Sequence, residues 1–156
     1  MKIVANNKKA YFNYFIEDKE ESGIELLGWE VKSARAGKVS LVDSFVFFGR
    51  EKGEKEGNIQ AWLKNAHFSP FEHGVVKDQE VRRDRRLLLR RAQIEKFYRA
   101  VMTKGVTCVV TKLYFSKGGY LKAEIALARG KQLHDKKQVI KERDLNREAE
   151  REIRGK

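Results

Sequence analysis

Residues 106–129 read VTCVVTKLYFSKGGYLKAEIALAR and contain the strongest fold signal in the chain. Two runs, 106–115 and 121–129, are rich in β-branched and aromatic residues with alternating apolar positions, as is typical of strands. The SKGG segment between them supplies glycines for a tight connection. The stretch therefore predicts an antiparallel β-hairpin.

The same pattern predicts four more strands upstream, at residues 11–17, 24–29, 44–48 and 59–63. The segments EDKEESG and GREKGEKEG would connect them in pairs as hairpins, since each is polar and contains glycine. Residues 64–80 contain the only proline and no clear period, which indicates a long irregular connection. Six antiparallel strands are expected in total.

Two helices are expected between these strands. A short one at residues 30–36 would end at Gly37 in the left-handed conformation. The other lies in RRAQIEKFYRAVMTKG, with Gly105 just after its end. Its apolar stripe has helical spacing and should pack on the sheet as core; the stripe comprises Ile94, Phe97, Tyr98, Val101 and Met102.

Six short strands that must hide one face fit a closed barrel better than an open sheet, because closure removes exposed strand edges. We therefore predict a mainly β fold, a six-stranded antiparallel barrel of the oligonucleotide-binding type with two or three short flanking helices. An α+β sandwich is the alternative. Residues 1–131 would form this domain, and residues 132–156 a highly charged tail that buries too little apolar surface to order itself in the free protein.

The composition points to an anionic partner, because 156 residues carry a formal net charge of +12. Such a field attracts phosphate backbones or anionic membranes, and the clustering of the basic residues favours nucleic acid. The longest apolar runs are far shorter than a membrane span, and the N-terminus lacks the apolar core of a signal peptide. With Cys108 as the only cysteine, a reducing, cytoplasmic location is expected, and Cys108 itself should be a buried small hydrophobe.

Motifs for catalysis or cofactors are lacking in the sequence. The segment KSARAGKV has Lys32 where a phosphate-binding loop needs its first glycine, and Val39 where it needs Ser or Thr. The three histidines, His67, His73 and His134, do not have zinc-site spacing. We therefore expect no cofactor, no metal and no enzymatic activity; an RNA nuclease or modifying enzyme is a formal alternative only.

Basic residues collect at two motifs. RRDRRLLLRR surrounds a triple leucine with arginines that could clamp phosphates, although a solvated helix start is the alternative; they are Arg82, Arg83, Arg85, Arg86, Arg90 and Arg91. In the tail, Arg143, Arg147, Arg151 and Arg154 would lie within about 80° on one helical face. Such a helix would be favoured when RNA neutralises the stripe.

Several ordered segments resemble the small protein B family, the protein partner of transfer-messenger RNA in bacterial ribosome rescue. They are NKKAYFNYFIEDKEESGIELLGWEVKSARAGK, DSFVFF, RRDRRLLLRRAQI, LYFSKGGYLKAEIALARGK and HDKKQVIKERD. The resemblance implies an oligonucleotide-binding barrel that acts without catalysis. It implies binding to the transfer-RNA-like part of transfer-messenger RNA, delivery with elongation factor Tu through the charged RNA, and a tail that probes the empty messenger channel of the ribosome as a helix. A monomer with no membrane partner is expected.

By motif, the resemblance implies an RNA-facing group of Asn7, Lys8, Glu21, Gly23, Leu88 and Lys122, to which the arginine motif adds Arg83, Arg85 and Arg86. It implies a second surface toward the 16S ribosomal RNA decoding centre, with Tyr14, Lys131, His134, Asp135, Lys136 and Lys137. Core packing is the alternative for Tyr14. A carboxylate such as Glu21 repels phosphate but accepts from a base or a 2′-hydroxyl, so it would serve positioning or specificity.

The chain departs from the family pattern at three positions. Val81 stands where the family usually has proline, Arg86 where it has lysine, and Lys137 where it has arginine. Arg86 keeps its charge, whereas Lys137 loses the two-pronged geometry of a guanidinium. Any contact at residue 137 that depends on a fork is therefore in question.

Overall fold

The computed structural model describes residues 2–51, 53, 57–70 and 78–131. Its longest hairpin joins β8 (Thr107–Phe115) and β9 (Leu121–Gly130), which pair antiparallel from Thr107 opposite Ala128 to Phe115 opposite Leu121. The turn has Gly119 at φ +82°, a conformation that glycine adopts without the steric penalty of a Cβ. The predicted hairpin at 106–129 is confirmed.

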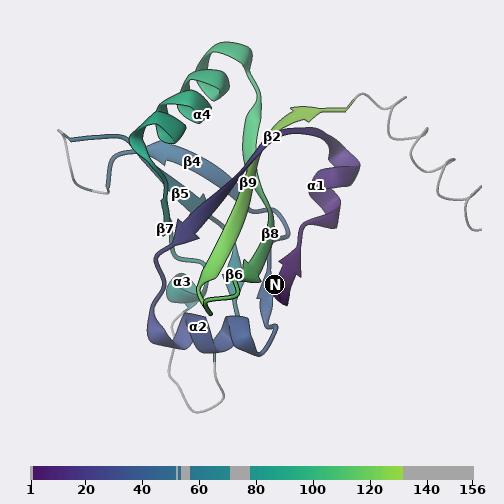
Figure 1. Ribbon diagram of the computed structural model, residues 1–156, viewed down its shortest axis with the longest axis vertical. Coiled ribbons are helices and arrows are strands. Elements are labelled where there is room, and N and C mark those ends of the chain that lie inside the picture. The colour runs from purple at the N-terminus through teal and green to yellow at the C-terminus, as the bar shows by residue number, and fades with distance from the viewer. Residues whose placement is uncertain (1, 52, 54–56, 71–77, 132–156) are drawn as a thin grey trace, which may run out of the picture.

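Six strands close into a ring in the order β8, β4, β5, β7, β2, β9, and β9 pairs again with β8. The other four ring strands are β2 (Tyr14–Ile24), β4 (Phe45–Gly49), β5 (Gln60–Lys64) and β7 (Arg85–Leu88). Every pairing is antiparallel. The predicted six-stranded antiparallel barrel is therefore confirmed, and the alternative, an α+β sandwich, is not the fold (Figure 1).

Shorter elements flank the ring. β1 (Lys2–Asn6) pairs with the outer edge of β8, while β3 (Val39–Ser40) and β6 (His67–Phe68) form a separate two-stranded sheet. The helices of the described residues are α1 (Lys8–Asn13), α2 (Gly28–Arg35), α3 (Asp78–Val81) and α4 (Arg91–Lys104). Helices α2 and α4 lie toward opposite ends of the barrel (Figure 1).

The core fills the barrel because alternate side chains of each strand point inward. On β4 and β5, for example, Val46, Phe48, Ala61 and Leu63 are buried between exposed or half-buried neighbours. Helix α4 closes one end by burying its apolar face, with Ile94, Phe97 and Ala100 against the sheet. Gly105 ends α4 at φ +64°, as predicted, whereas Met102 of the predicted core stripe is 66% exposed.

The N-terminal half differs most from the sequence-based prediction. Strands were predicted at residues 11–17 and 24–29 with a turn at EDKEESG, but β2 is a single strand that runs through this segment. A β-bulge between Glu17 and Glu20, with Asp18 at φ +51°, keeps β2 paired with β9 despite the polar residues. The flanking residues are helical instead, in α1 before β2 and in α2 from Gly28.

Strand β7 was also missed. Its residues belong to the arginine-rich motif, which reads as a helix start or a surface clamp, and it supplies the sixth ring strand in place of 24–29. The predicted irregular connection at 64–80 contains the short strand β6 and the start of α3. The predicted tail, 132–156, lies outside the described residues. Nowhere in the described part does a helix have the length and apolarity needed to cross a bilayer.

Candidate nucleic-acid interface

Three of the predicted RNA-facing residues lie in one row on the outer surface of the barrel. Gly23 of β2 is opposite Leu88 of β7 on one side and opposite Lys122 of β9 on the other. Tyr114 of β8 continues the row beyond Lys122. Residues that face one another across antiparallel strands share a face, so four strands from three distant parts of the chain form one strip. Leu88 is 48% exposed and gives the strip an apolar contact point.

Gly23 has a steric reason to be glycine. A Cβ at this position would lie 3.1 Å from Cβ of Leu88, closer than ordinary side-chain contacts. The absence of a side chain at Gly23 therefore leaves room for the Leu88 side chain beside β2. It also leaves the backbone of β2 uncovered at this point. A ligand backbone can approach such a position closely.

A second row next to the first contains two carboxylates. Glu21 of β2 is opposite Glu124 of β9, which in turn is opposite Lys112 of β8. The Tyr114 hydroxyl donates a hydrogen bond to Glu21 Oε2, and the Thr111 hydroxyl donates to Glu124 Oε1 at 2.7 Å. Like charges directly opposite destabilise a sheet, so these donors offset the repulsion and fix both carboxylates in place.

Two lysines lie beside Glu124, one of these two carboxylates. Lys112 Nζ lies 3.6 Å and Lys19 Nζ 3.7 Å from Glu124 carboxylate oxygens. Burial, and then the hydrogen bond to Glu21, raise the pKa of the Tyr114 phenol, so it stays a hydroxyl donor at neutral pH. Tyr114 and Glu124 are not predicted from the sequence as part of this surface. Tyr114 lies two residues after Lys112, and Glu124 two residues after Lys122, so each pair is expected on one face of its strand. This spacing does not show which strands lie side by side.

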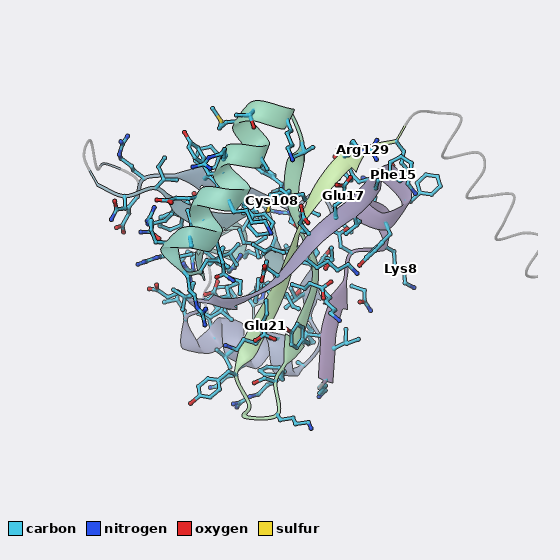
Figure 2. All side chains as sticks on the ribbon, turned by 45° about the horizontal axis from the view of Figure 1, so that its top comes forward. Lys8, Phe15, Glu17, Glu21, Cys108 and Arg129 are labelled. Atoms are coloured by element: carbon cyan, nitrogen blue, oxygen red, sulfur yellow. The ribbon has the colours of Figure 1, made fainter. Side chains whose placement is uncertain are left out.

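Asn7 and Lys8 begin α1 beside the bulge in β8. Asn7 is only 6% exposed, and its side chain is fully engaged in the fold. Its Oδ1 accepts from the Ala10 N–H at 3.1 Å as an N-cap, and its Nδ2 donates to the Val110 carbonyl at 3.0 Å. The Asn7 side chain therefore positions α1, and a contact between Asn7 and RNA stays a prediction. Lys8 is exposed at the surface (Figure 2).

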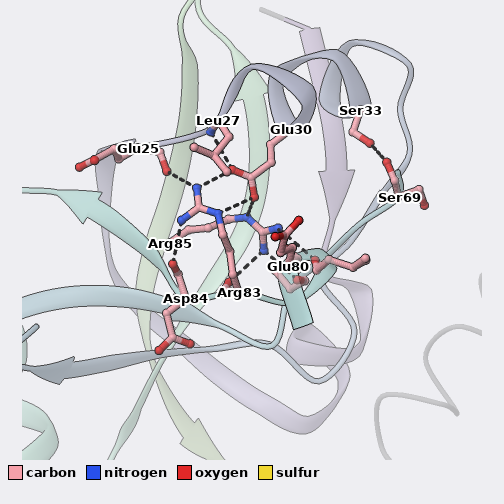
Figure 3. A network of polar contacts seen from close by, with 11 residues as sticks. Glu25, Leu27, Glu30, Ser33, Ser69, Glu80, Arg83, Asp84 and Arg85 are labelled. Atoms are coloured by element: carbon pink, nitrogen blue, oxygen red, sulfur yellow. Dashed lines mark hydrogen bonds and ion pairs between the residues drawn. The ribbon is translucent and has the colours of Figure 1, made fainter. Parts of the chain in front are cut away.

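The arginine motif splits between the inside and the outside of the barrel. Arg85 points inward and is 0% exposed, while Arg86 points outward and is exposed. Arg85 Nε donates to Glu30 of α2, which is itself fully buried (Figure 3). The Arg85 guanidinium also lies over the Phe68 ring, with Cζ 4.0 Å from the ring centroid. The prediction of Arg85 as an RNA contact is wrong, because a buried, paired guanidinium cannot reach a phosphate.

The other hydrogen bonds of Arg85 go to backbone carbonyls, those of Ala66 at 3.0 Å, Val81 at 3.0 Å, Arg83 at 3.2 Å and Glu80 at 3.4 Å. Burial lowers the pKa of this guanidinium, and the charge and hydrogen bond of Glu30 oppose that shift. Arg83 also binds Glu30, at 2.5 Å, with its side chain 28% exposed. Arg83 therefore lies at the surface but directs its guanidinium to Glu30 of α2. Of the three arginines, Arg86 is the one without an ion pair to another described residue.

The predicted decoding-centre surface begins at the other end of β2. Tyr14 is half-buried and packs against the small cluster of Ala10, Val109 and Ala128, in line with the core-packing alternative. Lys131 Nζ donates to the Tyr11 carbonyl at 3.1 Å. The remaining predicted residues, His134, Asp135, Lys136, Lys137, Arg143, Arg147, Arg151 and Arg154, lie outside the described residues.

An exposed aromatic side chain that was not predicted lies beside Lys131. Phe15 is 37% exposed, with the Arg129 guanidinium 4.8 Å and Lys131 Nζ 5.2 Å from its ring centroid. Arg129 also forms a 3.3 Å ion pair with Glu17. Figure 2 shows Phe15, Glu17 and Arg129 gathered at the end of β2 remote from Glu21. The chain therefore presents two separate charged surfaces along one strand.

Neither metal binding nor thiol chemistry has a site among the described residues. No group of three His, Cys, Asp or Glu side chains in this part of the chain is placed to hold an ion. Cys108 is 1% exposed, and burial raises the pKa of its thiol to about 12. It is a buried small hydrophobe, as predicted, because almost no thiolate forms at neutral pH.

Comparisons with known proteins agree on one family. The family model described as "SmpB protein" matches residues 4–155. An SsrA-binding protein of Syntrophotalea carbinolica is 46% identical over 155 residues, which are 99% of this chain and 97% of that protein. The SsrA-binding protein of Thermoanaerobacter pseudethanolicus is 46% identical over 156 residues, 100% of this chain and 94% of that protein. A solved structure described as "tmRNA-SmpB: a journey to the center of the bacterial ribosome" has a TM-score of 0.63 at 37% identity, covering 86% of this chain and 92% of that chain.

Proposed function

The chain belongs to the SmpB protein family, and from that premise we propose that it is an RNA-binding adaptor of trans-translation. It binds the transfer-RNA-like domain of transfer-messenger RNA, as the names SsrA-binding protein and tmRNA-SmpB of its relatives suggest. It helps to deliver this RNA to stalled ribosomes and takes the place of the missing anticodon arm. It acts in the cytoplasm as a monomer, meets elongation factor Tu only through the charged RNA, and catalyses no reaction.

The observation that carries the proposal is the strip in which Leu88, Gly23 and Lys122 meet from three strands, next to Glu21. The three side chains of this site offer different contacts to RNA. Leu88 packs on a ribose or base, Lys122 pairs with a phosphate, and Glu21 accepts from a 2′-hydroxyl or a base amino group. The Glu21 carboxylate repels phosphates but accepts hydrogen bonds from a 2′-hydroxyl or a base amino group. The site should therefore bind a folded RNA that presents such a group to Glu21 more tightly than it binds a simple polyanion.

The second part of the proposal concerns the ribosome. The surface around Phe15, Arg129 and Lys131 faces the decoding centre, and the chain that follows Lys131 enters the empty messenger channel. Phe15 is the best-placed described side chain for stacking on a ribosomal base, because it is exposed and flanked by two cations. Residues 134–137 would extend this contact, and the arginines from 143 to 154 would line a helix on ribosomal RNA.

A competition experiment tests the RNA partner. Purified protein is mixed with labelled transfer-messenger RNA and increasing unlabelled bulk transfer RNA, and retention is measured. We expect transfer-messenger RNA to be retained in excess transfer RNA, and expect Lys122→Gln or Leu88→Ala to weaken it. The matched controls Lys96→Gln and Met102→Ala change exposed residues of α4 and should bind like the parent chain. Equal competition by both RNAs would instead indicate a general ribosome-associated RNA-binding protein.

A further inference from the structure

A second aromatic and cationic row crosses the other half of the barrel. On the outer face, Phe47 of β4 is opposite Trp62 of β5, which is opposite Arg86 of β7. Phe47 is 44% exposed, and Lys64 Nζ lies 4.4 Å from its ring centroid. The Trp62 indole donates to the Gly49 carbonyl at 3.0 Å, which fixes the orientation of its ring. Large aromatic side chains held at a surface in this way are not needed for the core.

The row forms the floor of an open groove of about 1080 Å³. The described residues of its lining include five basic and three acidic ones, a net charge of +2 among them. Of these, Arg83 is committed to Glu30, and Asp84 lies 3.7 Å from Lys64. Arg86 lies at the floor and has no ion pair to another residue that the structure describes, and Arg82 donates a hydrogen bond to Asn65 Oδ1 at 3.2 Å. Aromatic planes and available guanidinium groups therefore share one concave surface.

We propose that this groove binds an unpaired RNA segment, with bases stacked on Phe47 and Trp62 and a phosphate on Arg86. Stacking on aromatic rings together with a backbone-tracking positive charge is how single-stranded nucleic acids are bound without a strict sequence requirement. A duplex does not fit this chemistry, because its base faces are already stacked. An acidic peptide would satisfy the arginine but would leave both aromatic faces unused.

The groove is distinct from the strip of the proposed function, and the inference goes beyond that function. The strip occupies β7, β2, β9 and β8, whereas the groove occupies β4, β5 and β7. The two share β7, where Arg86 faces the groove and Leu88 belongs to the strip. The protein would therefore hold one RNA feature on the strip and a separate unpaired segment in the groove.

Trp62 fluorescence provides the test. The full chain is titrated with an eight-nucleotide oligouridylate, and we expect quenching that is absent in Trp62→Phe, where only Trp29 remains. Phe47→Ala and Phe47→Leu should each weaken binding about tenfold, the size of one lost base stack. Arg86→Gln should lower the salt dependence of log K by about 0.7. Tyr120→Ala, at a 71% exposed aromatic in the β8–β9 turn, and Arg99→Gln, at an exposed arginine of α4, should change nothing.

Several outcomes would overturn the inference: no quenching by the oligouridylate, equal quenching by an RNA hairpin without unpaired ends or by polyglutamate, or parent-like binding by both Phe47 variants. Binding of the transfer-RNA-like domain is measured in parallel. We expect the Phe47 variants to retain it, and its loss together with oligouridylate binding would show that the groove is no separate site. If the protein shows no preference for transfer-messenger RNA, the oligouridylate titration still measures binding to the groove. Failure of the proposed function and failure of the groove proposal can therefore be distinguished.

Discussion

Arg85 and Arg86 are chemically identical neighbours on opposite faces of β7, and replacing each by leucine should separate stability from RNA binding. Arg85→Leu removes the inward guanidinium with its bond to Glu30 and its bonds to the Ala66 and Val81 carbonyls. Glu30 keeps Arg83 and the Leu27 N–H, at 2.7 Å, so its charge is not fully unpaired. Breaking a buried pair and leaving carbonyls unsatisfied costs about 3 to 5 kcal/mol of unfolding free energy.

Arg86→Leu should change the unfolding free energy by less than about 0.5 kcal/mol, because surface substitutions away from special contacts are nearly neutral. Its effect should be on RNA affinity and on the salt dependence of binding. Arg85→Leu should leave the salt dependence unchanged at temperatures where the variant is folded, because its charge never reaches RNA.

Urea unfolding followed by circular dichroism gives the two free energies, with the slope m checked to be the same in each variant. Filter binding of transfer-messenger RNA at several salt concentrations gives the second readout. A cost below about 1 kcal/mol for Arg85→Leu, or a change in salt dependence equal to that of Arg86→Leu, would refute the assignment of Arg85 to the interior network.

Three further predictions follow from the same structure. Glu21→Ala should weaken selective binding of transfer-messenger RNA about tenfold, and Tyr114→Phe about threefold, because the phenol fixes the carboxylate; unchanged affinity in a gel-shift assay would remove Glu21 from the interface. For Cys108, the raised thiol pKa favours the protonated folded state, so its contribution to stability is complete below pH 9 and is lost as the pH rises toward 12. The stability difference between parent chain and Cys108→Ala in urea unfolding should therefore shrink over that range, and a constant difference would contradict the burial of the thiol. Truncation after Lys131 should leave affinity for transfer-messenger RNA nearly intact but abolish tagging on stalled ribosomes in a cell-free assay; normal tagging by the short form would argue against a role of the tail in the messenger channel.

The predictable parts of this fold are those whose information is local. The β8–β9 hairpin follows from alternation and a glycine turn, and α4 follows from an apolar stripe that ends at Gly105. The count of six barrel strands was also correct, although one of the six was placed at 24–29 instead of in β7. The family motifs predict Glu21, Gly23, Leu88 and Lys122 as RNA-facing residues but do not show that these residues adjoin, which follows from the strand register.

The remaining features depend on partners far away in sequence. Strand β2 passes through a polar segment because β9 supplies a continuous edge and a bulge absorbs the irregularity, which no local pattern of β2 encodes. Arg85 is tolerated in the core because Glu30, 55 residues away, meets it there. Local propensity and charge determined the hairpin, the long helix and the basic character of this protein. Only the closed barrel decided which arginines reach solvent, because a side chain's face depends on register and register is set by the neighbouring strands.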